Sequence, residues 1–406
     1  MGRSSSSRTP TFRRLAALGL AALALIGCTG FQMSGPQSTL LTEGPVARMQ
    51  TGLFYITLWV TVFIFITVGG VLAYAQLKFR AKPGDDDTPP EQSHGHPLVE
   101  MGLIVASTLL LVIIAIPTVK GIAFQEDTPD RENALVVKVT GYQWWFKFEY
   151  PELGIVTANE MVIPTDRPVH IELRTIDVIH SFWVPRLAGK KDLIPNRANH
   201  MWLQADQPGY YWAQCAEYCG ESHANMKFRV VSLDPTDFAA WSQRQLADAR
   251  TVAAPVAATT GLDAADMPRF QLASAKPAGT EGASYAESPF AHWQMMQAEP
   301  TAGSEDAALI ARGHQLFQQK SCGACHTVRG HGSMGNIGPD LTHFGARTTL
   351  AAAVLDNTSE NLHRWLIDPN GVKPGNIMWK QGYVGYNIQL TSADVDALVA
   401  YLHSLK

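Results

Sequence analysis

Charged residues are scarce in this sequence. They make up 17% of its 406 residues, against roughly 25% in an ordinary soluble domain. Lysine and arginine number 32 and aspartate and glutamate 36, so the net charge is -4 and no basic surplus points to nucleic-acid binding. The five cysteines are an odd number, so internal disulfides would leave one over. Composition therefore argues against a nucleic-acid-binding, disordered or disulfide-rich protein, and the length allows two or three domains.

The N-terminus has the pattern of an export signal. Several arginines precede an apolar run from Leu15 to Ile26, as in the basic and hydrophobic regions of a secretory signal peptide. The run leads through Gly27 to Cys28 and resembles a bacterial lipobox, where cleavage leaves a lipidated cysteine. We therefore predict a signal peptide over residues 1–27 and a lipid anchor on Cys28. The alternative is a signal peptide followed by an incidental cysteine.

Two long apolar segments follow the predicted signal. Leu53–Leu77 and Met101–Val119 contain no charged residue, and each is long enough to cross a hydrocarbon core of about 30 Å as a helix. Basic residues at the start of the intervening loop place that loop in the cytoplasm and both ends outside. The prediction is a transmembrane hairpin over residues 28–125, with helices at about 53–77 and 100–119, in a bacterial inner (plasma) membrane.

The rest of the chain divides into three parts. Short apolar segments that alternate with Pro- and Gly-containing turns predict an all-β sandwich or barrel over residues 130–244. Residues 245–303 are rich in small residues and Pro and poor in large aliphatics, which predicts a flexible linker. Helical periodicity then predicts an all-α domain over residues 304–406, with helices at 307–320 and 392–405.

Residue types that bind metals are densest in the β-rich part. Cys215, Cys219, His223 and Met226 lie in one short segment between two predicted strands. Thiolate, imidazole and thioether groups together select copper, and such a set on a β-sandwich is typical of an electron-transfer site. Two thiolates can bridge two copper ions. That arrangement needs a second imidazole, for which His180 at the start of a predicted strand is the candidate.

Other interpretations of this segment are open. The Cys-x-x-x-Cys pair could form a disulfide in an oxidising compartment, belong to a thioredoxin-like copper-delivery protein, or bind zinc together with histidine. A disulfide does not explain the spacing of His223 and Met226, and the all-β pattern does not fit a βαβ redox fold. Binuclear copper is therefore the favoured interpretation.

Residues from about 53 to 233 resemble subunit II of the haem-copper cytochrome c oxidases. In that family a helical hairpin precedes a cupredoxin domain with a binuclear copper centre called CuA. The resemblance rests on Gly-Tyr-Gln-Trp-Trp-Phe at 141–146, His-Ser-Phe at 180–182 and the whole segment 215–226. It implies that two bridging thiolates, two imidazoles, a thioether and one backbone carbonyl bind the coppers, supplied by Cys215, Cys219, His180, His223, Met226 and Glu217.

The resemblance also implies roles around the copper centre. The Glu217 carboxylate would bind Mg²⁺ or Mn²⁺ at the interface with subunit I, and Trp144 would lie at the surface where electrons enter. The alternative for Trp144 is a core aromatic of the sandwich. Glu100 matches a carboxylate near a proton-uptake channel, and its alternative is a helix-boundary glutamate without a function. The implied partners are subunit I, subunit III, a cytochrome c donor and the lipid bilayer.

A second cofactor motif lies in the helical part. Cys322, Cys325 and His326 form Cys-x-x-Cys-His, the attachment motif of c-type haem, in which both cysteines form thioethers and the histidine binds iron. A thioredoxin-like redox pair is the alternative, and the adjoining histidine argues against it. Two methionines, Met334 and Met378, compete to be the sixth iron ligand.

Residues 373–378 resemble the Met loop of class I cytochromes c, which implies Met378 as the axial ligand. One departure is Trp379, where that family usually has proline. A methionine ligand raises the haem potential. The remaining histidines of the loops are expected to be solvated or hydrogen-bonded; they are His94, His96, His331 and His343.

The two apolar segments contain no histidine, so this chain cannot itself hold the oxygen-reducing centre that the family carries on subunit I. We expect a subunit that passes electrons from cytochrome c through covalent haem c to CuA, and on to subunit I for O₂ reduction with proton pumping. Two other functions are open: the corresponding subunit of a CuA-containing nitric oxide reductase, and a copper-delivery or assembly protein. A quinol oxidase subunit is disfavoured because such chains lose the copper ligands.

Overall fold

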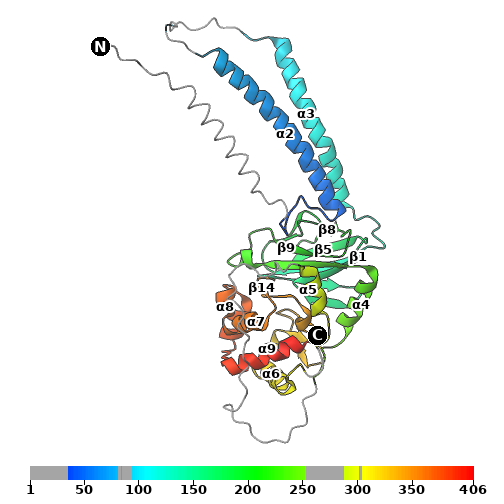
Figure 1. Ribbon diagram of the computed structural model, residues 1–406, viewed down its shortest axis with the longest axis vertical. Coiled ribbons are helices and arrows are strands. Elements are labelled where there is room, and N and C mark those ends of the chain that lie inside the picture. The colour runs from blue at the N-terminus through cyan, green and yellow to red at the C-terminus, as the bar shows by residue number, and fades with distance from the viewer. Residues whose placement is uncertain (1–34, 81–83, 85–93, 253–287, 301–303) are drawn as a thin grey trace, which may run out of the picture.

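The computed structural model describes residues 35–80, 84, 94–252, 288–300 and 304–406. Two long helices form a hairpin at one end of the molecule, a β-sandwich lies in the middle, and a mainly helical domain lies on the far side of the sandwich (Figure 1). This order confirms the expected fold class. The predicted signal peptide and Cys28 lie outside the described residues, as does most of the predicted linker.

The hairpin consists of α2 (Pro45–Lys78) and α3 (Pro97–Glu126). Both helices are long and apolar enough to cross a membrane, and their most apolar windows are 0% buried. Each helix extends beyond the apolar segment predicted from the sequence. Glu100 lies in the first turn of α3, at the end of the hairpin that is remote from the sandwich (Figure 1).

The opposite end of the hairpin is attached to the sandwich. Val46 and Ala47, in the first turn of α2, are 2% exposed, and Val46 belongs to the core of the sandwich. Near the end of α3, the carbonyl of Phe124 accepts a hydrogen bond of 2.9 Å from the Trp202 indole. These contacts fix the apolar helices relative to the β domain.

The sandwich has two five-stranded sheets, with strand orders β3-β2-β1-β5-β8 and β4-β10-β9-β6-β7. The pairs β1–β5 and β4–β10 are parallel, and the other neighbours are antiparallel. The strands are β1 Leu135–Tyr142, β2 Trp145–Tyr150, β3 Ile155–Ala158, β4 Glu160–Pro164, β5 Val169–Thr175, β6 His180–Trp183, β7 Lys190–Leu193, β8 Asn199–Leu203, β9 Gly209–Cys215 and β10 Lys227–Leu233.

Aromatic side chains fill the space between the sheets beneath the predicted metal segment. The ring of Phe228 on β10 lies 4.9 Å from that of Phe146 on β2 and 4.7 Å from that of Phe182 on β6. Such pairs contribute more than the apolar area they bury. They hold β6 and β10 in fixed positions, and these two strands flank the candidate ligands.

The predicted linker, residues 245–303, is wrong at both of its ends. After α4 (Pro235–Leu246), Ala249 is 5% exposed and packs in the core of the helical domain. Helix α5 (Pro289–Met296) then places Trp293, which is 3% exposed, in the core of the sandwich. One tryptophan buries roughly 150–250 Å², so a single aromatic anchors a segment whose average composition predicts a linker.

The C-terminal domain is mainly helical, as expected, with two short two-stranded hairpins in addition. Its helices and turns are α6 Ala307–Gln319, η2 Cys322–Ala324, η3 Phe344–Ala346, α7 Ser359–Ile367, α8 Pro369–Val372, η4 Met378–Val384 and α9 Ser392–Ser404. Its strands are β11 Thr327–Val328, β12 Ser333–Met334, β13 Thr349–Leu350 and β14 Leu355–Asp356.

Helices α6 and α9 cross at a glycine. A Cβ added to Gly313 would lie 2.0 Å from the carbonyl oxygen of Ala397 and 2.6 Å from Cβ of Tyr401. Backbone and Cβ atoms cannot swing aside as a flexible side chain can, so any larger residue would force the two helices apart.

Gly313→Ala is therefore expected to destabilise the helical domain by about 1–3 kcal/mol, the usual cost of overpacking. The measurement is amide hydrogen exchange of α6 and α9 in the full-length protein. Gln315→Ala changes an exposed position of the same helix and should leave the exchange rates unchanged. Equal protection in the Gly313 and Gln315 variants would contradict the assigned helix crossing.

Candidate metal centre and adjoining cavity

The loop between β9 and β10 gathers most of the predicted copper ligands. It leaves β9 at Cys215 and enters β10 after Met226, and the Cys215 amide donates a hydrogen bond of 2.9 Å to the Met226 carbonyl. Strand β6 pairs with β9 so that Phe182 faces Cys215, and this register brings His180 to the loop from the neighbouring strand. The sandwich thus places residues that are distant in the sequence around one point.

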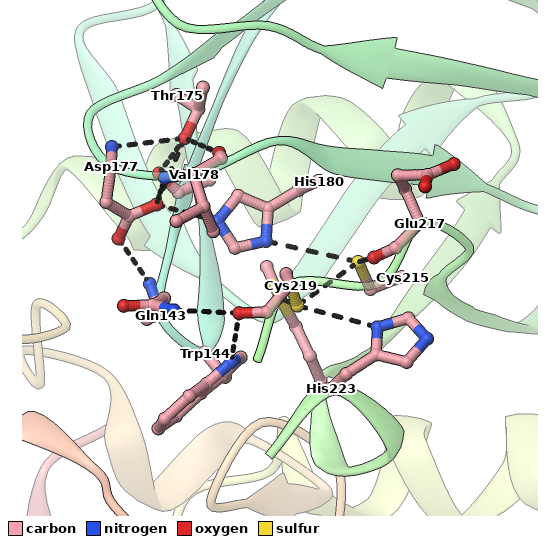
Figure 2. A network of polar contacts seen from close by, with 12 residues as sticks. Gln143, Trp144, Thr175, Asp177, Val178, His180, Cys215, Glu217, Cys219 and His223 are labelled. Carbon is pink, nitrogen blue, oxygen red and sulfur yellow. Dashed lines mark hydrogen bonds and ion pairs between the residues drawn. The ribbon is translucent and has the colours of Figure 1, made fainter. Parts of the chain in front are cut away.

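The two cysteine sulfurs lie 3.8 Å apart, and both thiols are free. A disulfide bond measures about 2.05 Å, so this geometry does not support the disulfide alternative. His180 Nδ1 lies 4.0 Å from Cys215 Sγ, and His223 Nδ1 lies 3.5 Å from Cys219 Sγ (Figure 2). Ligand atoms of His180, Cys215 and Cys219 all lie within 4.8 Å of one another.

The two weaker ligands implied by the resemblance also reach the cluster. Met226 Sδ lies 3.9 Å from Cys219 Sγ, and the Glu217 carbonyl oxygen lies 3.3 Å from Cys215 Sγ. Two thiolates, two imidazoles, a thioether and a carbonyl therefore surround one small volume. This donor set is soft and suits copper.

The cysteine pair already has unequal proton affinities without a metal. The hydrogen bond from the Cys219 thiol holds the pKa of Cys215 well below its usual range, while that same contact and burial raise the pKa of Cys219. The pair therefore loses its first proton more easily than its second, and thiolates rather than thiols are the ligands of metals.

Asp177 orients His180 and was missed in the sequence analysis. Its carboxylate contacts His180 Nε2 at 2.8 Å and accepts hydrogen bonds from the backbone amides of Gln143 and Val178, each at 2.7 Å (Figure 2). Burial lowers the pKa of His180, but hydrogen bonds with Asp177 and Cys215 raise it by more. The only sequence signal was an aspartate three residues before the candidate ligand.

Trp144 contacts the loop that carries the candidate copper ligands. Its indole Nε1 donates a hydrogen bond of 2.9 Å to the Cys219 carbonyl (Figure 2), and the side chain is 5% exposed within the core of the sandwich. In the whole chain the helical domain covers this side of the sandwich, so the side chain is buried. The role of Trp144 in electron entry stays a prediction.

Trp144 also forms part of the wall of a large cavity. The cavity lies between the sandwich and the helical domain, and residues of both line its wall. The predicted haem-binding side chains that line it are Cys322, Cys325, His326 and Met378.

His326 is held by one of its ring nitrogens. Its Nδ1 lies 2.8 Å from the Pro339 carbonyl, and burial lowers its pKa, so the neutral ring keeps Nε2 for a metal. A Cβ on Gly338 would lie 2.5 Å from the imidazole Cε1. Only glycine allows the loop to pass this close to the histidine.

The two candidate methionines differ sharply in position. Met378 lines the cavity and packs against the core of the helical domain, whereas Met334 is 79% exposed. Buried Asn376 holds the Met378 loop, because its side-chain amide donates to two carbonyls and its oxygen accepts from the Trp379 amide at 2.8 Å. Trp379, at the position where proline is usual, stacks on Tyr383.

Two family models match this chain. That of the periplasmic domain of cytochrome c oxidase subunit II matches residues 153–233, and that of cytochrome c matches residues 310–406. Cytochrome c oxidase subunit 2 of Alkalihalophilus pseudofirmus is 34% identical over 98% of this chain and 98% of its own length. The chain belongs to the cytochrome c oxidase subunit 2 family.

Other relatives agree with this assignment. Cytochrome c oxidase subunit 2 of Bacillus sp. PS3 is 32% identical over 97% of this chain and 98% of its own length. The solved periplasmic domain of cytochrome oxidase subunit II from Bradyrhizobium japonicum is 30% identical and covers 28% of this chain and 93% of that structure, with a TM-score of 0.27. The two full-length alignments extend over the apolar hairpin, the sandwich and the helical domain of this chain.

The remaining predicted positions lie apart from the cluster of candidate metal ligands. Glu100 is at the far end of the hairpin (Figure 1). His94 and His96 are exposed just before α3. His331 contacts the Tyr401 hydroxyl at 3.0 Å, and His343 contacts the Ala247 carbonyl at 3.2 Å. None of these four histidines belongs to the cluster of candidate ligands among the described residues.

Asp177→Ala is expected to weaken copper binding roughly 10–100-fold, the usual effect of removing a carboxylate that orients a ligating histidine. The measurement is competition of the purified protein with a copper chelator of known affinity. Asp237→Ala, at an exposed position of α4, is the matched control and should bind copper normally. Equal affinities in the two variants would contradict the role of Asp177.

Proposed function

We propose that this chain is the subunit through which electrons enter a terminal cytochrome c oxidase. They pass from cytochrome c to the covalent haem c, then to the binuclear CuA centre, and on to haem in subunit I, which reduces O₂ to water with proton pumping. One observation carries the proposal. Trp144 lines the candidate haem cavity and its indole is hydrogen-bonded to the Cys219 carbonyl, so the two cofactor sites share one side chain.

The copper part of the proposal is supported by the donor set. Cys215 and Cys219 would bridge the two ions, with His180, His223, Met226 and the Glu217 carbonyl as the other ligands. Two bridged coppers supply one-electron exchange. The chain contributes a buried, fixed ligand frame: Cys215 is 5% exposed, Cys219 is 2% exposed and His180 is 0% exposed. Because these ligands are buried from water and already in position, they would move little when an electron enters or leaves the copper centre.

The haem part is supported by the side chains of the cavity. Cys322 and Cys325 would form the thioether bonds, and His326 and Met378 would bind the iron from opposite sides. The haem supplies a second one-electron carrier. The Pro339 carbonyl holds the proton of His326 on Nδ1, and the apolar wall of the cavity favours the more oxidising potential that methionine ligation gives.

The proposed partners are the haem-copper subunit I, subunit III and a cytochrome c donor. Exposed apolar side chains lie beside the copper loop, with Tyr218 76% and Ile176 66% exposed, and such patches mark surfaces that partner proteins cover. We further propose that Glu217 contributes to a Mg²⁺ or Mn²⁺ site at the subunit I interface, and that Glu100 lies near a proton-uptake route. The hairpin and a lipidated Cys28 would anchor both domains on the outer face of the bacterial plasma membrane.

The two other functions have less support. A copper-delivery protein has no use for a haem cavity that adjoins the copper ligands. A nitric oxide reductase subunit would need the same electron carriers, but the relatives that match nearly the whole chain are named cytochrome c oxidase subunit 2. Oxygen consumption by the purified complex separates the two enzymes directly.

Cys219→Ser is expected to abolish the binuclear copper signal in electron paramagnetic resonance, because one bridging thiolate is lost. Haem c absorption should remain, and the haem should still be reduced by cytochrome c while oxygen consumption falls to background. Cys28→Ser makes the same chemical change at the N-terminus and should keep both signals. Full oxygen consumption in the Cys219 variant would refute the proposed electron path.

Met378→Ala is expected to lower the haem potential on the order of 100 mV or more, since axial ligands tune haem potentials over about 0.8 V. The measurement is a redox titration of the haem absorption bands. Met334→Ala, at a side chain that is 79% exposed, is the matched control and should leave the potential unchanged. A shift in the Met334 variant alone would reverse the ligand assignment.

A further inference from the structure

A buried carboxylate of the sandwich is bound entirely by the cytochrome domain. Glu160, at the start of β4, is 6% exposed. Its Oε1 accepts hydrogen bonds from the amide and the hydroxyl of Thr348, at 2.8 and 2.7 Å. The amide and hydroxyl of Thr349 approach the same oxygen at 3.2 and 3.4 Å. Four donors from one short segment of the cytochrome domain therefore meet a single oxygen of the sandwich.

Two arginines lie near Glu160, one from each domain. Arg229 of β10 is 2% exposed, lies with its guanidinium 3.9 Å from the centre of the Trp212 ring, and interacts electrostatically with Glu160. Burial raises the pKa of Glu160, and the hydrogen bonds of Thr348 and the charge of Arg347 oppose this rise only in part. A buried carboxyl group needs hydrogen-bond partners, so this part of the interface has a defined arrangement.

A second polar contact joins the domains next to the copper loop. Lys373 of the cytochrome domain is 3% exposed, and its ammonium donates to the backbone carbonyl of Trp144 at 2.5 Å and to that of Ala351 at 3.1 Å. The Ser222 hydroxyl of the copper loop donates to the Pro374 carbonyl at 2.6 Å. The segment that leads to Met378 is thus bound to the segment that holds the copper ligands.

The backbone between these contacts is strained and is held by the sandwich. Ala351, Ala352 and Ala353 have φ values of 54°, 61° and 57°, a left-handed conformation that non-glycine residues keep only where the surroundings impose it. The Ala352 carbonyl accepts a hydrogen bond of 3.2 Å from the amide of Lys227 on the sandwich. Ala352 also packs with Trp145 in a small core cluster that both domains share.

We propose that Glu160 and Lys373 are positioning residues that clasp the cytochrome domain onto the sandwich and fix the haem cavity against Trp144. The inference rests on the proposed function and deepens it. Electron transfer between the two cofactors then takes place in one fixed geometry rather than in repeated encounters of a tethered domain. One electron leaves the ferrous haem iron, which becomes ferric, and the oxidised copper pair is reduced by that electron; no bond or proton moves.

The test measures the rate of intramolecular electron transfer in the purified oxidase complex and compares this rate between the wild type and the variants. Haem c is reduced rapidly by light, and the absorbance of both centres is then recorded over time. In the wild type the rate should be independent of solvent viscosity. Glu160→Ala should slow transfer about tenfold or more, because the buried donors of Thr348 and Thr349 lose their acceptor and the cytochrome domain then occupies the transfer geometry for less of the time. The slowed rate should also fall as viscosity rises. Glu160→Gln, which keeps an acceptor of the same shape, should restore most of the rate.

Three controls separate positioning from damage. The haem potential and the copper resonance signal should be unchanged in Glu160→Ala, and Glu152→Ala, at an exposed position of the same domain, should behave as wild type. Thr348→Val changes a residue of the cytochrome domain and removes the hydroxyl that contacts both Glu160 and Tyr210 of the sandwich. It should slow transfer in the same direction, so the test stands even if the Glu160 variant fails to assemble copper. If either Glu160→Ala or Thr348→Val transferred electrons at the wild-type rate, and this rate did not depend on viscosity, the inference would be overturned. Absence of haem-to-copper transfer in the wild type would instead refute the proposed function.

Discussion

The hydrogen bond between the Cys215 amide and the Met226 carbonyl closes the loop that carries most of the candidate metal ligands. This backbone contact continues the antiparallel pairing of β9 and β10 and forces the intervening residues into a compact turn. Inside the turn, two thiols lie 3.8 Å apart. On its outer side, the Cys219 carbonyl faces the indole of Trp144. A change in the register of these two strands would displace the candidate ligands and the adjoining wall of the cavity together.

The parts of the site that the sequence predicts are those formed by local spacing. The Cys-x-x-x-Cys and Cys-x-x-Cys-His motifs each place their donors within a few residues, so one turn of chain suffices to bring them together. His180 could be named only as a candidate for the second imidazole, because the pairing of β6 with β9 decides its position. Asp177 was missed although it lies close to His180, since an aspartate before a strand is usually a turn residue.

The contacts between the two domains could not be predicted from the sequence. Glu160 and Thr348 are far apart in the chain. Glutamate and threonine are both common on protein surfaces, and the neighbouring sequence does not mark either residue as buried. Only the tertiary arrangement buries these two side chains, and a buried carboxyl group needs hydrogen-bond partners within the protein. The predicted linker was wrong at its ends for a related reason. Composition averages over many residues, whereas a few side chains such as Phe290 and Trp293 pack α5 against the core of the sandwich.

The polar character of the domain contact bears on how the fused cytochrome works. A tether alone raises the effective concentration of one site at the other but leaves orientation free. An apolar contact would add affinity and would tolerate small rotations, since hydrophobic attraction is non-directional. A carboxyl oxygen that meets the donors of Thr348 and Thr349 permits one orientation, because any rotation leaves a buried polar group with too few partners. The left-handed segment of residues 351–353 connects the contact at Glu160 to the contact at Lys373, so both contacts fix the same orientation of the domain. That lysine binds the backbone of the same tryptophan whose indole contacts the copper loop.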